Sequence, residues 1–129
     1  MLGQREPDVY GHESLRGVQL WTDQKLINQA ENEWFHSNVE GEIVTRIQQA
    51  STQGYDALII NPGGYAHTSV AIHDAMKILK FPIIEVHISQ VYQREAFRHT
   101  LLTAKAASAI MSGLGNQTYY VAILSQLHL

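Results

Sequence analysis

Two short apolar runs, each lying between stretches of helical periodicity, constrain the fold of this chain more than any other feature. Ala57–Ile60 is apolar at every position, and Pro82–His87 contains a single acidic residue before its final histidine. A short apolar run between helices is typical of a parallel strand that is buried on both faces. We therefore predict strands over 57–60 and 82–87, in an α/β layered fold with a mostly parallel sheet.

Weaker patterns divide the rest of the chain. The first 13 residues contain glycines and charges without apolar periodicity, and we predict that they form a loop. Five stretches suit helices and two further runs suit short strands. The predicted helices span 14–30, 40–51, 68–79, 91–98 and 118–129, and the additional strands span 33–36 and 109–111.

Composition and charge limit the class of protein. The chain has 129 residues, 45% hydrophobic and 16% charged, so one packed domain is expected. The net charge of −3 and the lack of a basic stripe argue against nucleic acid as a partner. The absence of cysteine excludes thiol catalysis and suits a reducing compartment. No apolar run reaches membrane-spanning length and the N-terminus has no signal-peptide core, so a cytoplasmic protein without membrane contact is expected.

Polar residues follow both predicted strands. Asn61 comes after the first strand and His87 ends the second, and ligands of such sheets bind beyond the carboxyl ends of the strands. In the segment 61–69, glycines allow close backbone approach, a helix start near Thr68 suits an anion, and His67 can bind hydroxyl groups. An ordinary strand–turn–helix connection with a capping histidine fits this segment equally well.

Glu85 and His87 lie two residues apart, on one face of the predicted strand. The carboxylate can therefore orient the histidine for acid–base chemistry. A core histidine with one hydrogen bond is the equal alternative.

An arginine–tyrosine pair and a pair of arginines are further candidates. A cation near a phenol favours the phenolate, so Arg5 can make Tyr10 a usable base, although a polar surface loop explains the same residues more simply. Arg94 and Arg98 share one face of the predicted helix and suit a substrate carboxylate or a mobile lid, or else form a solvated helix face.

No metal or cofactor motif is present. The histidines at positions 67, 73, 87 and 99 lack a recognised ligand spacing, and His-Glu-x-x-His is absent. Gly-x-Ser-x-Gly, Gly-x-Gly-x-x-Gly and a phosphate-binding loop are absent as well. We therefore expect neither a catalytic metal nor a cofactor.

Taken together and in order, five segments resemble the type II dehydroquinases (3-dehydroquinate dehydratases) over most of the chain. These segments are 2–11, 37–41, 60–71, 84–89 and 94–99. The resemblance implies a single type II dehydroquinase domain over 1–129, with a flavodoxin-like three-layer sandwich and a parallel sheet. It also implies homotrimers that build a homododecamer.

The resemblance implies a cofactor-free hydro-lyase that converts 3-dehydroquinate into 3-dehydroshikimate by anti elimination through an enolate. The reaction belongs to the shikimate pathway of aromatic amino-acid biosynthesis or to quinate catabolism. In the role that the resemblance gives each residue, Tyr10 is the base, Arg5 stabilises the developing charge and His87 is the acid. Glu85 orients His87, and Asn61 holds a substrate oxygen.

The resemblance also assigns a substrate-binding set. Its members are Asn61, His67, Asp74, Ile88, Ser89, Arg94 and Arg98. Within this set, Ile88 and Ser89 bind the substrate carboxylate, Arg98 binds a ring hydroxyl and Arg94 belongs to a lid. Asp74 reaches the site of a neighbouring subunit.

The chain departs from the family pattern in several places. His36, His73, Gln90 and the segment 103–105 differ from the usual residues, and none of these changes removes a proposed catalytic group. The largest departure is the family's first, central strand, which ends in Asn-Gly-Pro-Asn-Leu-Asn and which this sequence lacks. Its loss leaves backbone N–H and C=O groups of the neighbouring strands unpaired, and it removes an asparagine that helps to stabilise the enolate.

Three explanations for the missing strand compete: an internal start of a longer protein, an incomplete sequence, which we favour, or a domain that closes the gap. The last leaves an alternative function, a catalytically impaired oligomeric relative that binds substrate without turnover. A flavodoxin-like module that binds a small anion or nucleotide is a third possibility, and the tyrosine–arginine loop argues against it.

Overall fold

A parallel sheet forms the centre of the protein. In the computed structural model, which describes residues 14–127, the strands are β1 (Leu58–Ile60), β2 (Ile83–His87) and β3 (Ala109–Ser112), in that order across the sheet. Both pairings are parallel, with Leu58 opposite Ile83 and His87 opposite Ser112. The predicted α/β fold with a parallel sheet is therefore confirmed.

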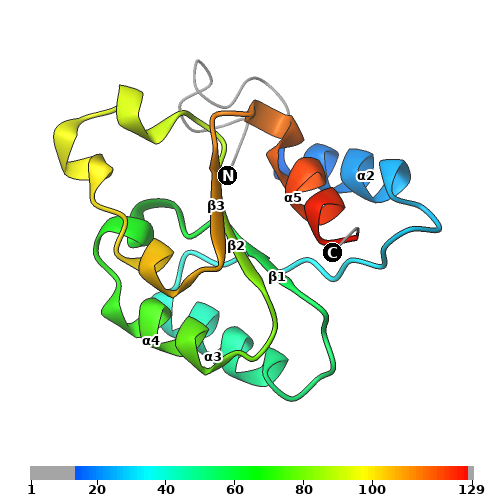
Figure 1. The fold of residues 1–129 in the computed structure, drawn as a ribbon, viewed down its shortest axis with the longest axis horizontal. Coiled ribbons are helices and arrows are strands. Elements are labelled where there is room, and N and C mark those ends of the chain that lie inside the picture. Colours follow the sequence, from blue (N-terminus) through cyan, green and yellow to red (C-terminus); the bar gives the residue numbers. More distant parts are fainter. Residues whose placement is uncertain (1–13, 128–129) are drawn as a thin grey trace.

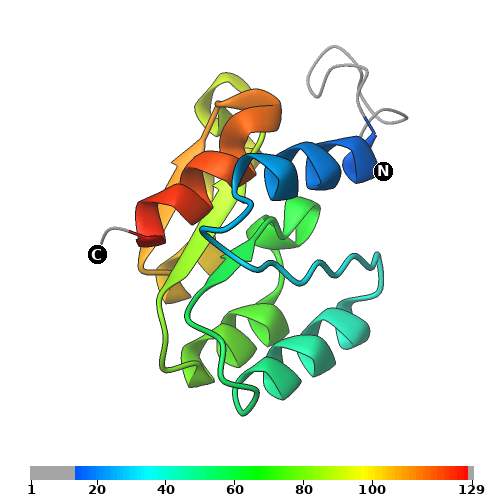
Figure 2. The same cartoon turned by 90° about the vertical axis from the view of Figure 1, so that its right-hand side faces the viewer.

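Helices cover both faces of this sheet. Figures 1 and 2 show α3 and α4 on one face and α2 and α5 on the other. The α-helices are α2 (Leu15–Lys25), α3 (Glu40–Ala50), α4 (Val70–Ile78) and α5 (Thr118–Leu127). Short 3₁₀ turns connect them: η1 (Gly63–His67), η2 (Val91–Gln93), η3 (Ala96–His99), η4 (Thr103–Ala106) and η5 (Gly115–Gln117). The predicted three-layer sandwich is present.

The alternation of side chains along β2 divides the apolar core in two. Ile84 and Val86 pack with residues of α2 and α5, including Val18 and Ala122. Ile83 faces the other way, into a cluster formed by α3 and α4. Because β2 is buried at all five positions, its apolar run has no solvent face. No helix in residues 14–127 is long and apolar enough to cross a membrane.

Two predicted helices differ from the observed ones. The helix predicted over 14–30 ends at Lys25, and Asn28 then adopts a left-handed backbone with φ 69°, which stops helix propagation. The helix predicted over 91–98 is instead the two turns η2 and η3, separated at Arg94 and Glu95. Glu95 has an extended backbone (ψ 149°), and this interrupts the helical hydrogen bonding.

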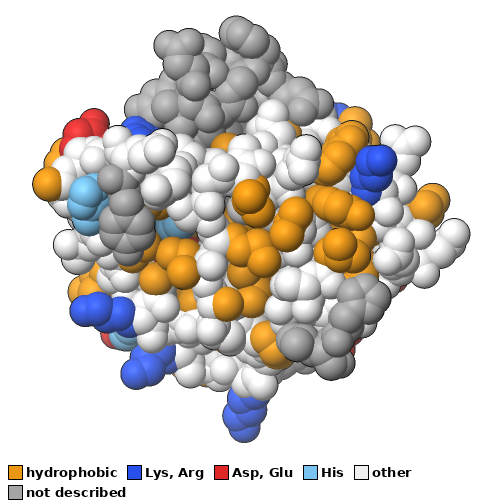
Figure 3. All heavy atoms as spheres, turned by 45° about the horizontal axis from the view of Figure 1, so that its top comes forward, with side chains coloured by type: hydrophobic (Ala, Val, Ile, Leu, Met, Phe, Trp, Pro, Cys, Tyr) orange, Lys and Arg blue, Asp and Glu red, His pale blue; other side chains and the backbone are white. Residues whose placement is uncertain are grey.

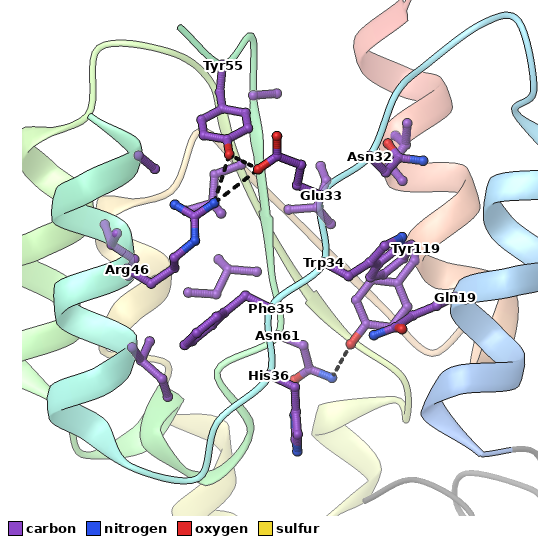
Figure 4. A pocket seen from close by; sticks show the side chains of 18 of the residues that line it. Gln19, Asn32, Glu33, Trp34, Phe35, His36, Arg46, Tyr55, Asn61 and Tyr119 are labelled. Atoms are coloured by element: carbon purple, nitrogen blue, oxygen red, sulfur yellow. Dashed lines mark hydrogen bonds and ion pairs between the residues drawn. The ribbon is translucent and has the colours of Figure 1, made fainter. Parts of the chain in front are cut away.

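The predicted strand over 33–36 was wrong. This segment runs beside β1 without pairing with it, and a cavity of about 260 Å³ lies between the two (Figure 4). Leu58 N–H donates to Pro82 O, so the alternation of a strand directs the backbone groups of Ile59 toward this cavity. A strand needs a hydrogen-bonded neighbour, and none of the described residues 14–127 supplies one beside 33–36.

Polar contacts hold this unpaired segment in place. The Asp23 carboxylate on α2 accepts hydrogen bonds from Asn32 Nδ2 (2.9 Å) and Trp34 Nε1 (3.0 Å). Between these two residues, Glu33 contacts Arg46 of α3 at 3.4 Å, and Arg46 also donates to the Tyr55 hydroxyl at 2.8 Å. The segment therefore keeps its position through side chains from both helical layers.

Asp23→Ala is expected to lower the free energy of unfolding by about 1–3 kcal/mol, because Trp34 Nε1 and Asn32 lose a charged acceptor. The matched control is Asp56→Ala, which removes an exposed carboxylate and should change stability by less than about 0.5 kcal/mol. Urea unfolding followed by tryptophan fluorescence measures both. Equal effects of the two substitutions would show that Asp23 does not anchor the segment.

Candidate active site

A polar cavity of about 540 Å³ lies at the carboxyl ends of β1 and β2. Seven of the residues predicted for the site line it: Asn61, His67, His87, Ile88, Ser89, Arg94 and Arg98. They come from the carboxyl end of β2 and from the segments that follow β1 and β2, which is where parallel α/β sheets bind ligands. The local motifs of the sequence, although up to 37 positions apart, therefore meet in one space.

Asn61 is fixed by contacts on both sides of its amide group. Its Oδ1 accepts from Gly63 N–H at 3.0 Å, closing a turn in which Gly63 has φ 59°. A left-handed backbone of this kind suits glycine. Its Nδ2 donates to the Tyr119 hydroxyl at 3.2 Å, as Figure 4 shows. The orientation of the amide is set before any ligand binds.

His87 is paired with a buried carboxylate. Its Nε2 lies 2.8 Å from Glu85 Oε2, and Glu85 is 0% exposed. Since an ionised carboxylate only accepts hydrogen bonds, Nε2 carries the proton of this pair. Nδ1 is then the ring nitrogen left for proton transfer in the cavity. The alternative, a core histidine with one hydrogen bond, shares this contact. The place of His87 in the cavity lining favours the oriented histidine.

Arg94 and Arg98 bracket Glu95 at the rim of the cavity. Arg98 Nε lies 2.8 Å from Glu95 Oε2, and Arg94 Nε lies 3.9 Å from the same oxygen. A backbone hydrogen bond at Glu95, followed by the Arg98 guanidinium, holds the pKa of that carboxyl below its usual range. Arg94 also reaches the Ser89 hydroxyl at 3.5 Å. The sequence predicted that the two arginines share one helix face. They do not, because Arg94 lies in the break between η2 and η3 and Arg98 lies in η3.

The sequence left open whether His67 caps the helix that follows it, which is α4. His67 does not cap the helix, because Ser69 does: its hydroxyl accepts from Ile72 N–H at 3.0 Å. His67 Nδ1 instead lies 2.8 Å from the carbonyl oxygen of Thr100. With Nδ1 donating to that carbonyl, Nε2 is an acceptor for a ligand hydroxyl.

The structure does not bring every predicted residue to this cavity. Asp74 lies on α4 with its side chain 68% exposed and contacts His73 at 2.9 Å, away from the cavity lining. Arg5 and Tyr10 lie outside the described residues. Among residues 14–127, no cluster of three or more side chains has the makeup of a metal site.

Two functional contacts were missed from the sequence. The Tyr119 hydroxyl accepts from Asn61 across 58 positions, and Thr103 donates its hydroxyl proton to Glu85 Oε1 across 18 positions. Neither residue belongs to a local motif. No signal in the sequence alone marks them, because both contacts depend on how α5 and η4 pack against the sheet.

The fold and the cavity define an α/β protein with a binding site for a small polar ligand. A sequence model of the family described as dehydroquinase class II matches residues 1–127. The 3-dehydroquinate dehydratase of Afipia carboxidovorans is 47% identical over 125 residues, covering 96% of this chain and 83% of the relative. The protein of the same name from Janthinobacterium sp. is 42% identical, covering 95% of this chain and 86% of the relative.

A solved structure extends this likeness to three dimensions. The type II dehydroquinase from Butyrivibrio crossotus has a TM-score of 0.92 and 36% identity, covering 99% of this chain and 89% of that one. The resemblance inferred from five sequence segments is confirmed, and this chain belongs to the type II dehydroquinase family.

Proposed function

We propose that this chain is a 3-dehydroquinate dehydratase, which removes water from 3-dehydroquinate to give 3-dehydroshikimate. The observation that carries the proposal is the His87–Glu85 pair opening on a cavity that also holds two arginines and a fixed asparagine. The relatives that share 42–47% of its residues bear the same enzyme name. Incubation with 3-dehydroquinate, followed by detection of the conjugated enone, tests this function directly.

The reaction divides into two proton transfers. A base removes a proton from C2, and the electron pair of that C–H bond becomes an enolate. The enolate then re-forms the carbonyl while the C1–O bond breaks, and an acid protonates the departing hydroxyl as water. We assign the base to Tyr10, assisted by Arg5, and the acid to His87. In that role His87 delivers a proton carried on Nδ1 to the departing hydroxyl, while its Nε2–H stays on Glu85.

The cavity suits the charge of the substrate. The substrate carboxylate is bound by the backbone N–H groups of Ile88 and Ser89 and by the Ser89 hydroxyl, at the end of β2. Arg98 and His67 bind ring hydroxyls, Asn61 holds a further substrate oxygen, and Arg94 closes over the ligand. All these residues contribute hydrogen-bonding groups in a partly water-excluded space, where such contacts are strong.

Arg98→Met is expected to raise KM about tenfold to a hundredfold and to lower kcat less, because the lost hydrogen bonds hold substrate and transition state alike. Steady-state kinetics measures both constants. Arg16→Met is the matched control, since Arg16 is exposed on α2 and does not line the cavity. A KM for Arg98→Met within about twofold of the control would remove Arg98 from the binding set.

The proposal extends to assembly and location. We propose that residues 1–129 form one domain, that it builds trimers and a dodecamer, and that it works in the cytoplasm. Exposed Val70 and Ile78 on α4 support assembly, as does exposed Ile110 on the edge strand β3. Figure 3 shows Lys and Arg at the rim of one face with apolar side chains near its middle, which suits contact with protein rather than nucleic acid. In this assembly, Asp74 reaches the active site of a neighbouring subunit. Sedimentation measures the size of the assembly.

The alternative function, a relative that binds substrate without turnover, has no support in the comparisons. It predicts tight binding of 3-dehydroquinate with no enone product. The same incubation therefore separates the two functions, provided that binding is measured in parallel by calorimetry.

A further inference from the structure

The Glu85 carboxylate is buried and contacted at both of its oxygens. Oε2 faces His87 Nε2 at 2.8 Å, and Oε1 accepts the hydroxyl proton of Thr103. Glu85 and Thr103 are both 0% exposed. A buried carboxylate oxygen without a donor is strongly disfavoured, so the Thr103 hydroxyl matters for the state of the whole pair.

Thr103 belongs to a different element from the histidine it affects. It opens η4, which packs against both α4 and β2. Its side chain does not line the cavity, so it has no access to a bound ligand. The Glu85 carboxylate therefore links the Thr103 hydroxyl to the cavity.

The terminal torsion of a glutamate is soft, and a single contact leaves it free to turn. A second hydrogen bond, on the other oxygen, restricts this rotation and leaves Oε2 directed at His87. A Glu85 held with Oε2 toward the ring keeps one proton of His87 on Nε2, so the proton that reaches the substrate is a second one, carried on Nδ1. The chain thus contains a buried series of contacts running Thr103, Glu85, His87.

We propose that Thr103 is a positioning residue, whose hydroxyl holds Glu85 in the orientation that sets the tautomer of His87. The proposal rests on the proposed function in one respect, namely that His87 transfers a proton to substrate. The competing interpretation is that Thr103 only fills space beside β2, in which case its shape matters and its hydroxyl does not.

Two variants separate these interpretations. Thr103→Val keeps the shape and removes the hydroxyl, whereas Thr103→Ser keeps the hydroxyl and removes a methyl group. The first measurement is the ¹⁵N spectrum of His87 in the ligand-free protein, which reports the tautomer of the ring. The second is kcat and KM with 3-dehydroquinate.

Thr103→Val is expected to shift the His87 ring signals toward the other tautomer and to lower kcat about tenfold, with KM within about twofold. Thr103→Ser is expected to keep the original spectrum and kcat within about twofold. An unchanged spectrum and kcat in the valine variant would overturn the proposal, as would a serine variant as impaired as the valine variant. If the valine variant does not fold, the serine variant decides: retained signals and rate support the proposal, and their loss overturns it.

The spectrum keeps this proposal separate from the proposed function. If Thr103→Val shows the expected tautomer shift but the parent chain has no turnover, the lyase assignment is contradicted and the role of Thr103 stands. If the parent chain turns over substrate but its His87 spectrum equals that of the valine variant, the Thr103 proposal is contradicted and the lyase assignment stands.

Discussion

His87→Asn is expected to lower kcat for the dehydration of 3-dehydroquinate by about 10²–10⁴-fold, while KM changes by less than about threefold. Asparagine preserves a polar side chain at the end of β2 but cannot deliver a proton to the departing hydroxyl. The His87 ring is placed for that transfer because Glu85 holds Nε2 at 2.8 Å. Steady-state kinetics gives both constants.

The result for His87→Asn is meaningful only if the variant still folds and binds ligand. Removing the imidazole leaves Glu85 without its Nε2 partner, so the melting temperature must be compared with that of the parent protein. Calorimetry with a carboxylate competitor measures binding. A folded variant that binds normally and retains kcat within about threefold of the parent would show that His87 is not the acid.

Tyr10→Phe is expected to lower kcat by about 10²–10⁴-fold, because phenylalanine cannot accept the C2 proton. The loss should fall on kcat, since the proposed task of the phenol is proton abstraction rather than substrate binding. Single-turnover kinetics separates the chemical step from product release. An active Tyr10→Phe protein would refute the assignment of the base.

Tyr120→Phe is the matched control for this experiment. Tyr120 packs edge-on against Trp21, with ring centroids 5.5 Å apart, at the contact between α5 and α2. It lies outside the cavity lining, and phenylalanine preserves the ring contact. This control should keep kcat within about twofold of the parent value, which shows that loss of a tyrosine hydroxyl alone does not stop the reaction.

Strands β1 and β2 could be predicted from the sequence because each is a short apolar run between helical stretches. Strand β2 is buried at all five positions, and β1 is partly buried. The predicted runs 57–60 and 82–87 match the observed Leu58–Ile60 and Ile83–His87 closely. The segment 33–36 could not be predicted correctly from its own residues. Its pairing depends on a neighbouring strand, and beside β1 there is a cavity where that neighbour would lie. Strand formation there is a property of the sheet rather than of the segment.

The candidate site could be predicted in outline for a related reason. Asn61 and His87 follow adjacent parallel strands, so topology alone brings their side chains together. The contacts of Thr103 with Glu85 and of Tyr119 with Asn61 could not be predicted, because they join elements far apart in the sequence through tertiary packing. The structure sharpened the role of Glu85 in particular, since it places a partner on each carboxylate oxygen.

The central claim is that these 129 residues convert 3-dehydroquinate into 3-dehydroshikimate. Its most direct test is the absorbance of the conjugated enone after the purified, folded protein is mixed with 3-dehydroquinate, with His87→Asn as the negative control. We predict product formation in proportion to enzyme concentration, with kcat in the ordinary enzyme range of about 1–10³ s⁻¹. Absence of enone at high concentration of a folded protein that binds the substrate would contradict the claim.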